Sequence, residues 1–144
     1  MEPDQDIILR QYELMVNSTF QVTNWRQTAN NFFLAINTTL VAIAAYLYNF
    51  SPSTGIIIGV IGIGITILWY ETIHYFRALN KSKFIVIHDI EKKLPIMMFS
   101  MEYDHFRKEK REIATQIECK IPCLFAVVYL AIIVILILKI GGIL

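Results

Sequence analysis

The sequence predicts an all-α integral membrane protein with three transmembrane helices, an N-terminal amphipathic cytosolic helix and a helical cytosolic segment between spans two and three. The first observation is composition, because only 17% of the 144 residues are charged, whereas soluble domains carry about 25%. The second is that residues 31–70 contain no charged side chain and residues 121–144 contain only Lys139. The third is length, since a bilayer needs about 20 apolar residues for each helix.

Residues 1–31 are predicted to form the N-terminal cytosolic helix. The chain starts with acidic and polar residues, unlike a secretory signal peptide, which starts basic and then becomes apolar. We therefore expect the internal spans to drive insertion. Apolar side chains recur at steps of three and four residues, as they do on one face of a helix. They are Ile7, Ile8, Tyr12, Met15, Val16 and Phe20.

Residues 32–70 are predicted to form a transmembrane hairpin, with span one from Phe32 to about Phe50 and a short uncharged turn at 50–54. Asn37, Thr38 and Thr39 lie inside span one. Polar groups that face lipid are costly, so we expect them to turn toward other helices. Two interpretations stay open, namely helix–helix packing and a polar lining for a pore or cavity.

Small side chains mark one face on each helix of this hairpin. Three glycines of span two share a face because their spacing is i, i+4 and i+7, and span one carries a stripe of small side chains. Such faces let helix backbones approach closely, so that dispersion can hold them together. We therefore predict a helix-packing and oligomer interface formed by Gly55, Gly59, Gly62, Ala35, Thr38 and Ala42.

Residues 71–120 are predicted to be cytosolic and helical. They hold ten of the thirteen basic residues, and the positive-inside rule places such a segment, and with it the N-terminus, in the cytosol. Span two is expected to continue as a helix to about Asn80. A second helix is expected from about Lys81 to Lys93, stopped by Pro95, and a third from about Ser100, as its N-cap, to Glu118.

Residues 121–144 are predicted to hold span three, from Ile121 to about Leu138. Pro122 is expected in the first turn of this helix, where a missing N–H costs no hydrogen bond. Three crossings place the C-terminus outside the cytosol. The predicted segments are therefore 1–31, 32–70, 71–120 and 121–144.

No motif in the chain indicates an enzyme, a metal or a cofactor. The chain contains no phosphate-binding loop, no Gly-x-Ser-x-Gly and no Cys-x-x-Cys. Glu71 and His74 have the Glu-x-x-His spacing of di-metal bundles, but such sites need two copies of it. We expect an interfacial hydrogen bond there, and a ring of His74 side chains in an oligomer could respond to pH.

The remaining polar groups indicate no ligand either. His88 to Glu91 is expected to be a solvated helix face, and Cys119 and Cys123 are expected to be small packing residues. The net charge of +1 gives no nucleic-acid signature, which would need a clearly basic face.

Several stretches of this sequence, taken together and in order, resemble the RipA-like family of small bacterial cytoplasmic-membrane proteins. They are Gln11–Thr19, Arg26–Thr39, Trp69–Asn80 and Lys83–Glu91, followed by Leu94–Pro95. The resemblance implies a homo-oligomer, described for the family as an octamer, in the bacterial inner membrane. It carries over no catalytic residue, and the family has been linked to adaptation and survival inside host cells.

These observations, together with the resemblance, predict a homo-oligomeric inner-membrane protein with an extracytoplasmic C-terminus. It is expected to act as a ring-shaped membrane scaffold or interaction assembly that supports the envelope or adaptation to stress or a host. The alternative is an oligomeric channel or transport-like pore lined by Asn37, Thr38 and Thr39. The expected partners are further copies of the chain and membrane lipids, and no other protein partner is indicated.

Overall fold

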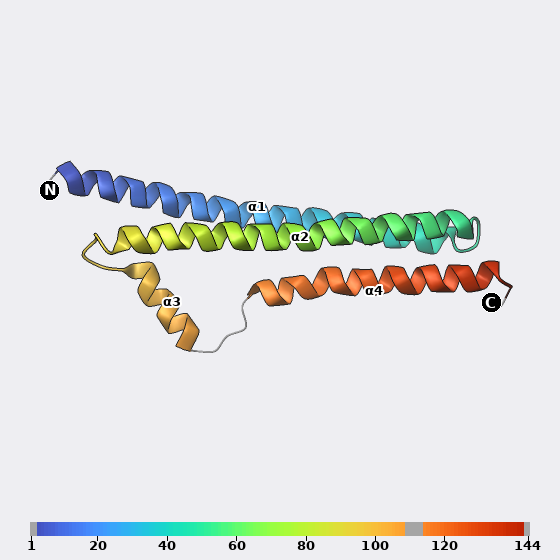
Figure 1. Ribbon diagram of the computed structural model, residues 1–144. Helices are drawn as coiled ribbons and strands as arrows, with labels where there is room; N and C mark the ends of the chain where they lie inside the picture. The colour runs from blue at the N-terminus through green and yellow to red at the C-terminus, as the bar shows by residue number, and fades with distance from the viewer. Residues whose placement is uncertain (1–2, 109–113, 143–144) are drawn as a thin grey trace. The chain divides into compact units, whose positions relative to one another are not determined.

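The computed structural model describes the backbone of residues 3–108 and 114–142 and the side chains of 5–105 and 117–142. Within this part of the chain there are four α-helices and no strand (Figure 1). They are α1 (Pro3–Leu47), α2 (Pro52–Glu91), α3 (Met98–Lys108) and α4 (Ala114–Ile140). Helices α1, α2 and α4 are long and apolar enough to cross a membrane. The predicted all-α fold with three spans is confirmed.

Helices α1 and α2 are each about twice as long as a bilayer requires. They contain 45 and 40 residues, or about 68 and 60 Å at ~1.5 Å per residue, against a hydrocarbon layer of about 30 Å. The predicted helix end near Asn80 is wrong, because α2 runs unbroken to Glu91. The physical reason is that residues 71–91 contain neither proline nor glycine, so nothing interrupts the hydrogen-bonded ladder.

The predicted starts of the last two helices are also wrong, because α3 begins at Met98 and α4 begins at Ala114, before the predicted Ile121. The helix that was predicted from Ser100 to Glu118 crosses residues 109–113, which lie outside the described part of the chain. Pro122 lies inside α4 and not in its first turn, where the missing N–H removes one backbone hydrogen bond. Helix α3 starts before Ser100, since the N–H of Met101 already donates to the carbonyl of Met97 at 3.0 Å.

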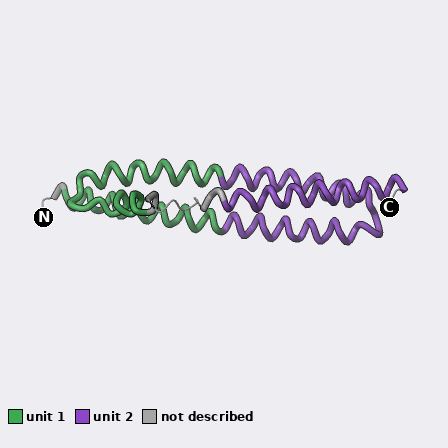
Figure 2. The backbone as a smooth tube through the Cα atoms, turned by 90° about the horizontal axis from the view of Figure 1, so that it is seen from below, with its two compact units in different colours: residues 1–27, 74–113 green, residues 28–73, 114–144 purple. Residues whose placement is uncertain are grey.

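The chain divides into two compact units (Figure 2). Unit 1 contains residues 1–27 and 74–113, and unit 2 contains residues 28–73 and 114–144. This division follows contacts within the protein and not the bilayer. The predicted segment boundaries at 31, 70 and 120 therefore stay a prediction.

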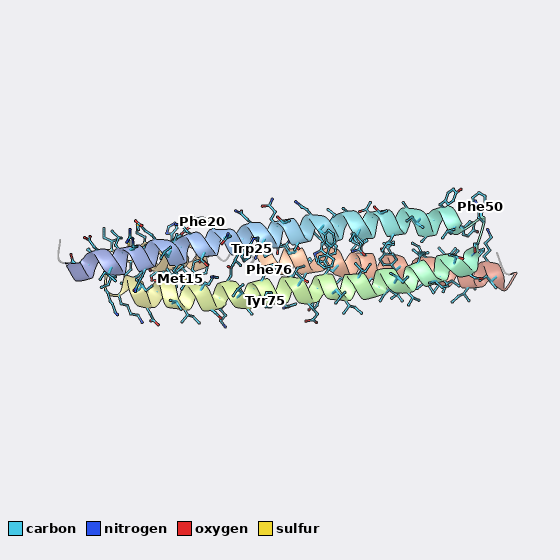
Figure 3. All side chains as sticks on the ribbon, turned by 90° about the horizontal axis from the view of Figure 1, so that it is seen from above. Met15, Phe20, Trp25, Phe50, Tyr75 and Phe76 are labelled. Atoms are coloured by element: carbon cyan, nitrogen blue, oxygen red, sulfur yellow. The ribbon has the colours of Figure 1, made fainter. Side chains whose placement is uncertain are left out.

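Unit 2 is a bundle in which parts of α1 and α2 pack with α4. Residues 48–51 make the turn between α1 and α2, and the N–H of Ser51 donates to the carbonyl of Leu47 at 2.9 Å. Phe50 lies at this turn in Figure 3. The side chains buried in this bundle are Asn37, Ala44, Thr66, Trp69, Ile73, Tyr129 and Leu136.

Unit 1 combines the first part of α1, the last part of α2 and the short α3. Phe99 of α3 packs between two other aromatic rings, with its ring centre 6.3 Å from that of Tyr12 and 6.0 Å from that of Phe84. Phe20 projects from α1 on the side away from α2, whereas Phe76 lies between the two helices (Figure 3). The side chains buried in this unit include Tyr12, Thr19, Val22, Ile87 and Glu91.

Candidate functional site: helix-packing faces and buried polar clusters

The three glycines of span two face α4 of the same chain. A Cβ atom on Gly62 would lie 2.3 Å from Cζ of Tyr129, and one on Gly59 would lie 2.8 Å from Cγ1 of Ile133. At Gly55 the nearest atom, Cδ1 of Leu136, would be 2.9 Å away. A side chain at any of these positions would force its neighbour on α4 to shift, so the glycine face is already covered inside the protomer.

The stripe of small side chains in span one is not part of this buried contact between α2 and α4. Ala35, Thr38 and Ala42 are exposed on the protomer, whereas the three glycines face α4. Thr38 Oγ1 donates to the carbonyl of Leu34 at 2.8 Å, and Thr39 Oγ1 donates to that of Ala35 at 2.9 Å. Both threonines therefore satisfy their hydroxyls within α1, and their predicted roles in an oligomer interface or a polar lining stay predictions.

Unlike Thr38 and Thr39, which follow it in the sequence, Asn37 is completely buried. Its Oδ1 lies 3.0 Å from Oγ1 of Thr66 and 3.1 Å from the hydroxyl of Tyr129, and its Nδ2 donates to the carbonyl of Phe33 at 2.8 Å. The Tyr129 hydroxyl is also 3.0 Å from the backbone carbonyl of Asn37. One amide thus joins α1, α2 and α4, and it fixes how the three helices lie along one another.

Trp69 connects the helices of unit 2 close to Glu71, the first charged residue after the uncharged stretch 31–70. Its Nε1 donates to Oδ1 of Asn30 at 2.9 Å, and its ring stacks on Phe33 and contacts Phe125, each with ring centres 6.0 Å apart. Indole rings with one polar contact suit the membrane–water boundary.

Lys139 connects the end of α4 to the turn between α1 and α2, far along the helices from Trp69. Its Nζ donates to the carbonyl of Tyr48 at 2.8 Å and to Oδ1 of Asn49 at 3.3 Å, and it lies 3.6 Å from the centre of the Tyr48 ring. A cation placed here satisfies carbonyl groups at the end of α1 that have no partner inside the helix.

The other polar residues considered in the sequence do not form a ligand-binding arrangement in the described part of the chain. Among the described residues, no group of three or more His, Cys, Asp or Glu side chains could hold a metal ion. His74 is half-buried and Glu71 is exposed, and the predicted pH response of His74 stays a prediction. Cys119 and Cys123 are not joined by a disulfide.

Glu91 is the buried acid of unit 1 and corrects the expectation of a solvated face at 88–91. Its side chain is completely buried at the end of α2. The backbone N–H of Phe99 donates to Oε1 at 2.7 Å, and the N–H and hydroxyl of Ser100 donate to Oε2 at 3.1 and 2.7 Å. The carboxylate therefore caps the first turn of α3 in place of the predicted Ser100 cap.

Tyr12 completes this cluster from α1, because its hydroxyl donates to Oε1 of Glu91 at 3.1 Å. Burial acts to raise the pKa of Glu91, but the hydrogen bonds from Ser100, Phe99 and Tyr12 outweigh it and hold the pKa below the ordinary value. Burial, followed by the bond to Glu91 and its charge, raises the pKa of Tyr12 to about 12. The acid is thus ionised and the phenol protonated at neutral pH.

Sequence reasoning missed Glu91 as a site, although one signal was present. Glu91 lies four residues after Ile87 and seven after Phe84, so it shares a helix face with these two apolar residues. Asp89 does lie on the solvated face, where it pairs with Lys92 at 2.7 Å. An acid in phase with an apolar face and shortly before a chain reversal is a candidate cap for the helix that follows.

Three long apolar helices and buried polar clusters closed within one chain define a small helical integral membrane protein. The sequence matches the Octameric membrane protein family (8xMP) over residues 9–138, and the chain belongs to this family. Membership implies that the chain self-associates, as was predicted. No curated protein and no solved structure shows significant similarity to the chain.

Proposed function

We propose that the protein is a ring-shaped scaffold or interaction assembly of the bacterial inner membrane and that it is not an enzyme. The observation that supports a scaffold is the closure of the polar groups in unit 2. Asn37 and Thr66 are buried and bonded to each other within the protomer, while most of the outer surface of the bundle is apolar. In the part of the chain that the structure describes, the protomer offers helices for packing and no converging cluster of His, Cys, Asp or Glu side chains that could hold a metal ion.

The proposed topology has a cytosolic N-terminus and an extracytoplasmic C-terminus. It is supported by the ten basic residues between 71 and 120 and by the positive-inside rule. A reporter fused after Leu144 should be active outside the cytosol, and one inserted at the exposed Asp104 should be active inside it. The reverse pattern would contradict the orientation.

The scaffold proposal is tested by the mass and symmetry of the purified particle. Native mass spectrometry of the protein in nanodiscs, combined with imaging of the particle, should give a closed ring whose centre is filled by lipid or sealed by protein. A monomer would contradict self-association, and a dimer would contradict a ring. An open, water-filled centre would contradict the scaffold and favour a pore.

A pore is the second candidate, because one specific observation favours it. Of the three residues predicted to line a pore, Thr38 and Thr39 are exposed on α1, where they could line a central opening, whereas Asn37 is buried. In a protein without Cys119 and Cys123, Thr38→Cys should then react with a small aqueous thiol reagent. Val127→Cys, on the exposed apolar face of α4, is the matched control that should stay inert. An inert Thr38→Cys would remove the support for a pore.

A further inference from the structure

The outer faces of unit 2 differ in the size of their side chains. On α1 the exposed side chains of Ala35, Thr38 and Ala42 form a small stripe between larger exposed ones such as Leu34 and Tyr46. On α4 most of the exposed side chains are large and aliphatic, beside the smaller Cys123 and Ala131. The exposed fractions are 53–63% at Leu124, Val127, Leu130, Val134 and Ile137. Large aliphatic side chains suit lipid tails, whereas small side chains let another helix approach closely. The α4 face therefore fits lipid and the α1 face fits protein.

Gly64 gives a second and independent observation on the outer face of α2. A Cβ atom at Gly64 would meet nothing within 4 Å, in contrast to the three glycines that face α4. Its neighbours Ile61, Ile67 and Leu68 are large and exposed, so Gly64 is a notch in an apolar surface. Glycine costs a helix about 1 kcal/mol relative to alanine, and no contact inside the protomer requires it.

The hydrogen bonds of unit 2 show which part of α1 lies at the height of this notch. The antiparallel helices are tied by Asn30 to Trp69 and by Asn37 to Thr66. Gly64 is five residues from Trp69 and two from Thr66. The same steps along α1 lead from Asn30 to position 35 and from Asn37 to position 39. The stripe around Ala35 and Thr38 is therefore level with Gly64.

In a ring with rotational symmetry, two surfaces at the same height on one copy can form the contact between neighbouring copies. A closed ring is built from heterologous contacts, in which each subunit offers two different surfaces to its two neighbours. Rotation about an axis along the membrane normal leaves heights unchanged. A stripe and a notch at one height, on the outer faces of two different helices, meet these conditions.

We propose that the small stripe of α1, formed by Ala35, Thr38 and Ala42, packs against Gly64 on α2 of the next copy. This inference rests on the proposed self-association into a ring and names its contact within the membrane. The alanine and threonine side chains enter the glycine notch, so that the two helices approach closely. Helix α4 then faces lipid at the outside of the ring.

Disulfide cross-linking in the full-length protein tests this contact. In a background without Cys119 and Cys123, the double variant Ala35→Cys with Gly64→Cys should, on oxidation, give a ladder of covalent oligomers up to the whole assembly. Each copy then offers one thiol to each neighbour, and the bond forms only where Cα atoms approach to about 4.4–6.8 Å. Each single variant should stay monomeric under denaturing conditions.

The matched control replaces the α1 position by one on α4 at a similar height. Tyr129 bonds to Asn37, so Val127 lies close to the height of Ala35. Gly64→Cys with Val127→Cys should give no ladder. A ladder from this control, or covalent dimers from either single variant, would overturn the proposal in favour of another pairing.

A bulky substitution at the notch gives a second test that needs no new bond. Gly64→Leu should cause loss of the full assembly in native mass spectrometry and leave a helical protomer, since the protomer has space there. If the assembly survives Gly64→Leu and the double-cysteine variant gives no ladder, the contact is wrong while self-association stands. If the unmodified protein is monomeric, the proposed scaffold fails as well.

Discussion

The side chain of Tyr129 fills the space that is left because Gly62 has no side chain. The phenol ring occupies the position that any Cβ on residue 62 would need, and its hydroxyl reaches both oxygens of Asn37. The missing side chain on α2 thus allows a hydrogen bond between α4 and α1. A small residue here serves two purposes, namely close packing and the placement of a polar group.

Gly62→Ala should destabilise the protomer by about 1–3 kcal/mol, because an added methyl group in a tightly packed core forces its neighbours to move. The measurement is thermal unfolding, followed by circular dichroism in a detergent that dissociates the assembly. Gly64→Ala is the matched control and should unfold at or above the temperature of the parent, since its methyl group meets open space. Equal effects of the two variants would contradict the packing described for Gly62.

Glu91→Gln should weaken the attachment of α3 and do so in a pH-dependent way. Loss of a buried charged acceptor costs about 1–3 kcal/mol. Because the pKa of Glu91 is lowered from 4.5 in the folded protein, its stabilising effect is present above that value. The effect is lost as the pH falls through the folded-state pKa.

The difference in unfolding temperature between the parent and Glu91→Gln should therefore be largest near neutral pH and shrink in acid. Asp89→Asn removes the same charge from the exposed face of α2 and should change the unfolding temperature little. A difference between the parent and Glu91→Gln that does not depend on pH would contradict the role of the carboxylate.

Among single residues, the sequence indicated those whose role follows from helical phase. The shared face of Gly55, Gly59 and Gly62 follows from their spacing, and the structure places them together. Which helix would cover that face could not be read from the spacing, because α4 is distant in sequence. The bond from Glu91 to the first turn of α3 was hidden for the same reason, since it depends on how the chain turns between α2 and α3.

Lys139 connects the ends of two helices and should restrain the turn between α1 and α2. Lys139→Met should raise hydrogen–deuterium exchange at the amides of residues 48–51, because the carbonyl of Tyr48 loses its donor. Lys139→Arg keeps a donor and a cation and should exchange nearly as the parent does. Unchanged exchange in Lys139→Met would show that the turn is held by its own backbone bonds.

The helices themselves were predicted with unequal success. Their number across the membrane follows from long apolar runs, and it is confirmed. Their ends were predicted poorly where a change of charge was taken for a change of structure. Residues 71–91 become charged without any helix-breaking residue, so α2 continues. At α4, Pro122 was assigned to the first turn, whereas that helix tolerates the proline in its interior.

For the molecule as a whole, composition and charge distribution were enough to predict a helical membrane protein, whereas its self-association was predicted from the small-residue faces and from the family resemblance. The positions of its contacts were less predictable. A face of small residues looks alike whether it is covered within a chain or between chains. The structure identifies the glycines that are covered within the chain, because a Cβ atom at Gly62 would meet Tyr129 whereas one at Gly64 would meet nothing within 4 Å.

The glycine face of α2 also has a consequence for the order of synthesis. Chains emerge from the ribosome at about 5–20 residues per second, so α4 follows the α1–α2 hairpin by a delay on the order of seconds. During that delay Asn37 and Thr66 can already pair, but Gly55, Gly59 and Gly62 form an uncovered groove. A nascent hairpin is then open to capture by α4 of an older copy. Exchange of α4 between copies is therefore the assembly error that we expect for this fold.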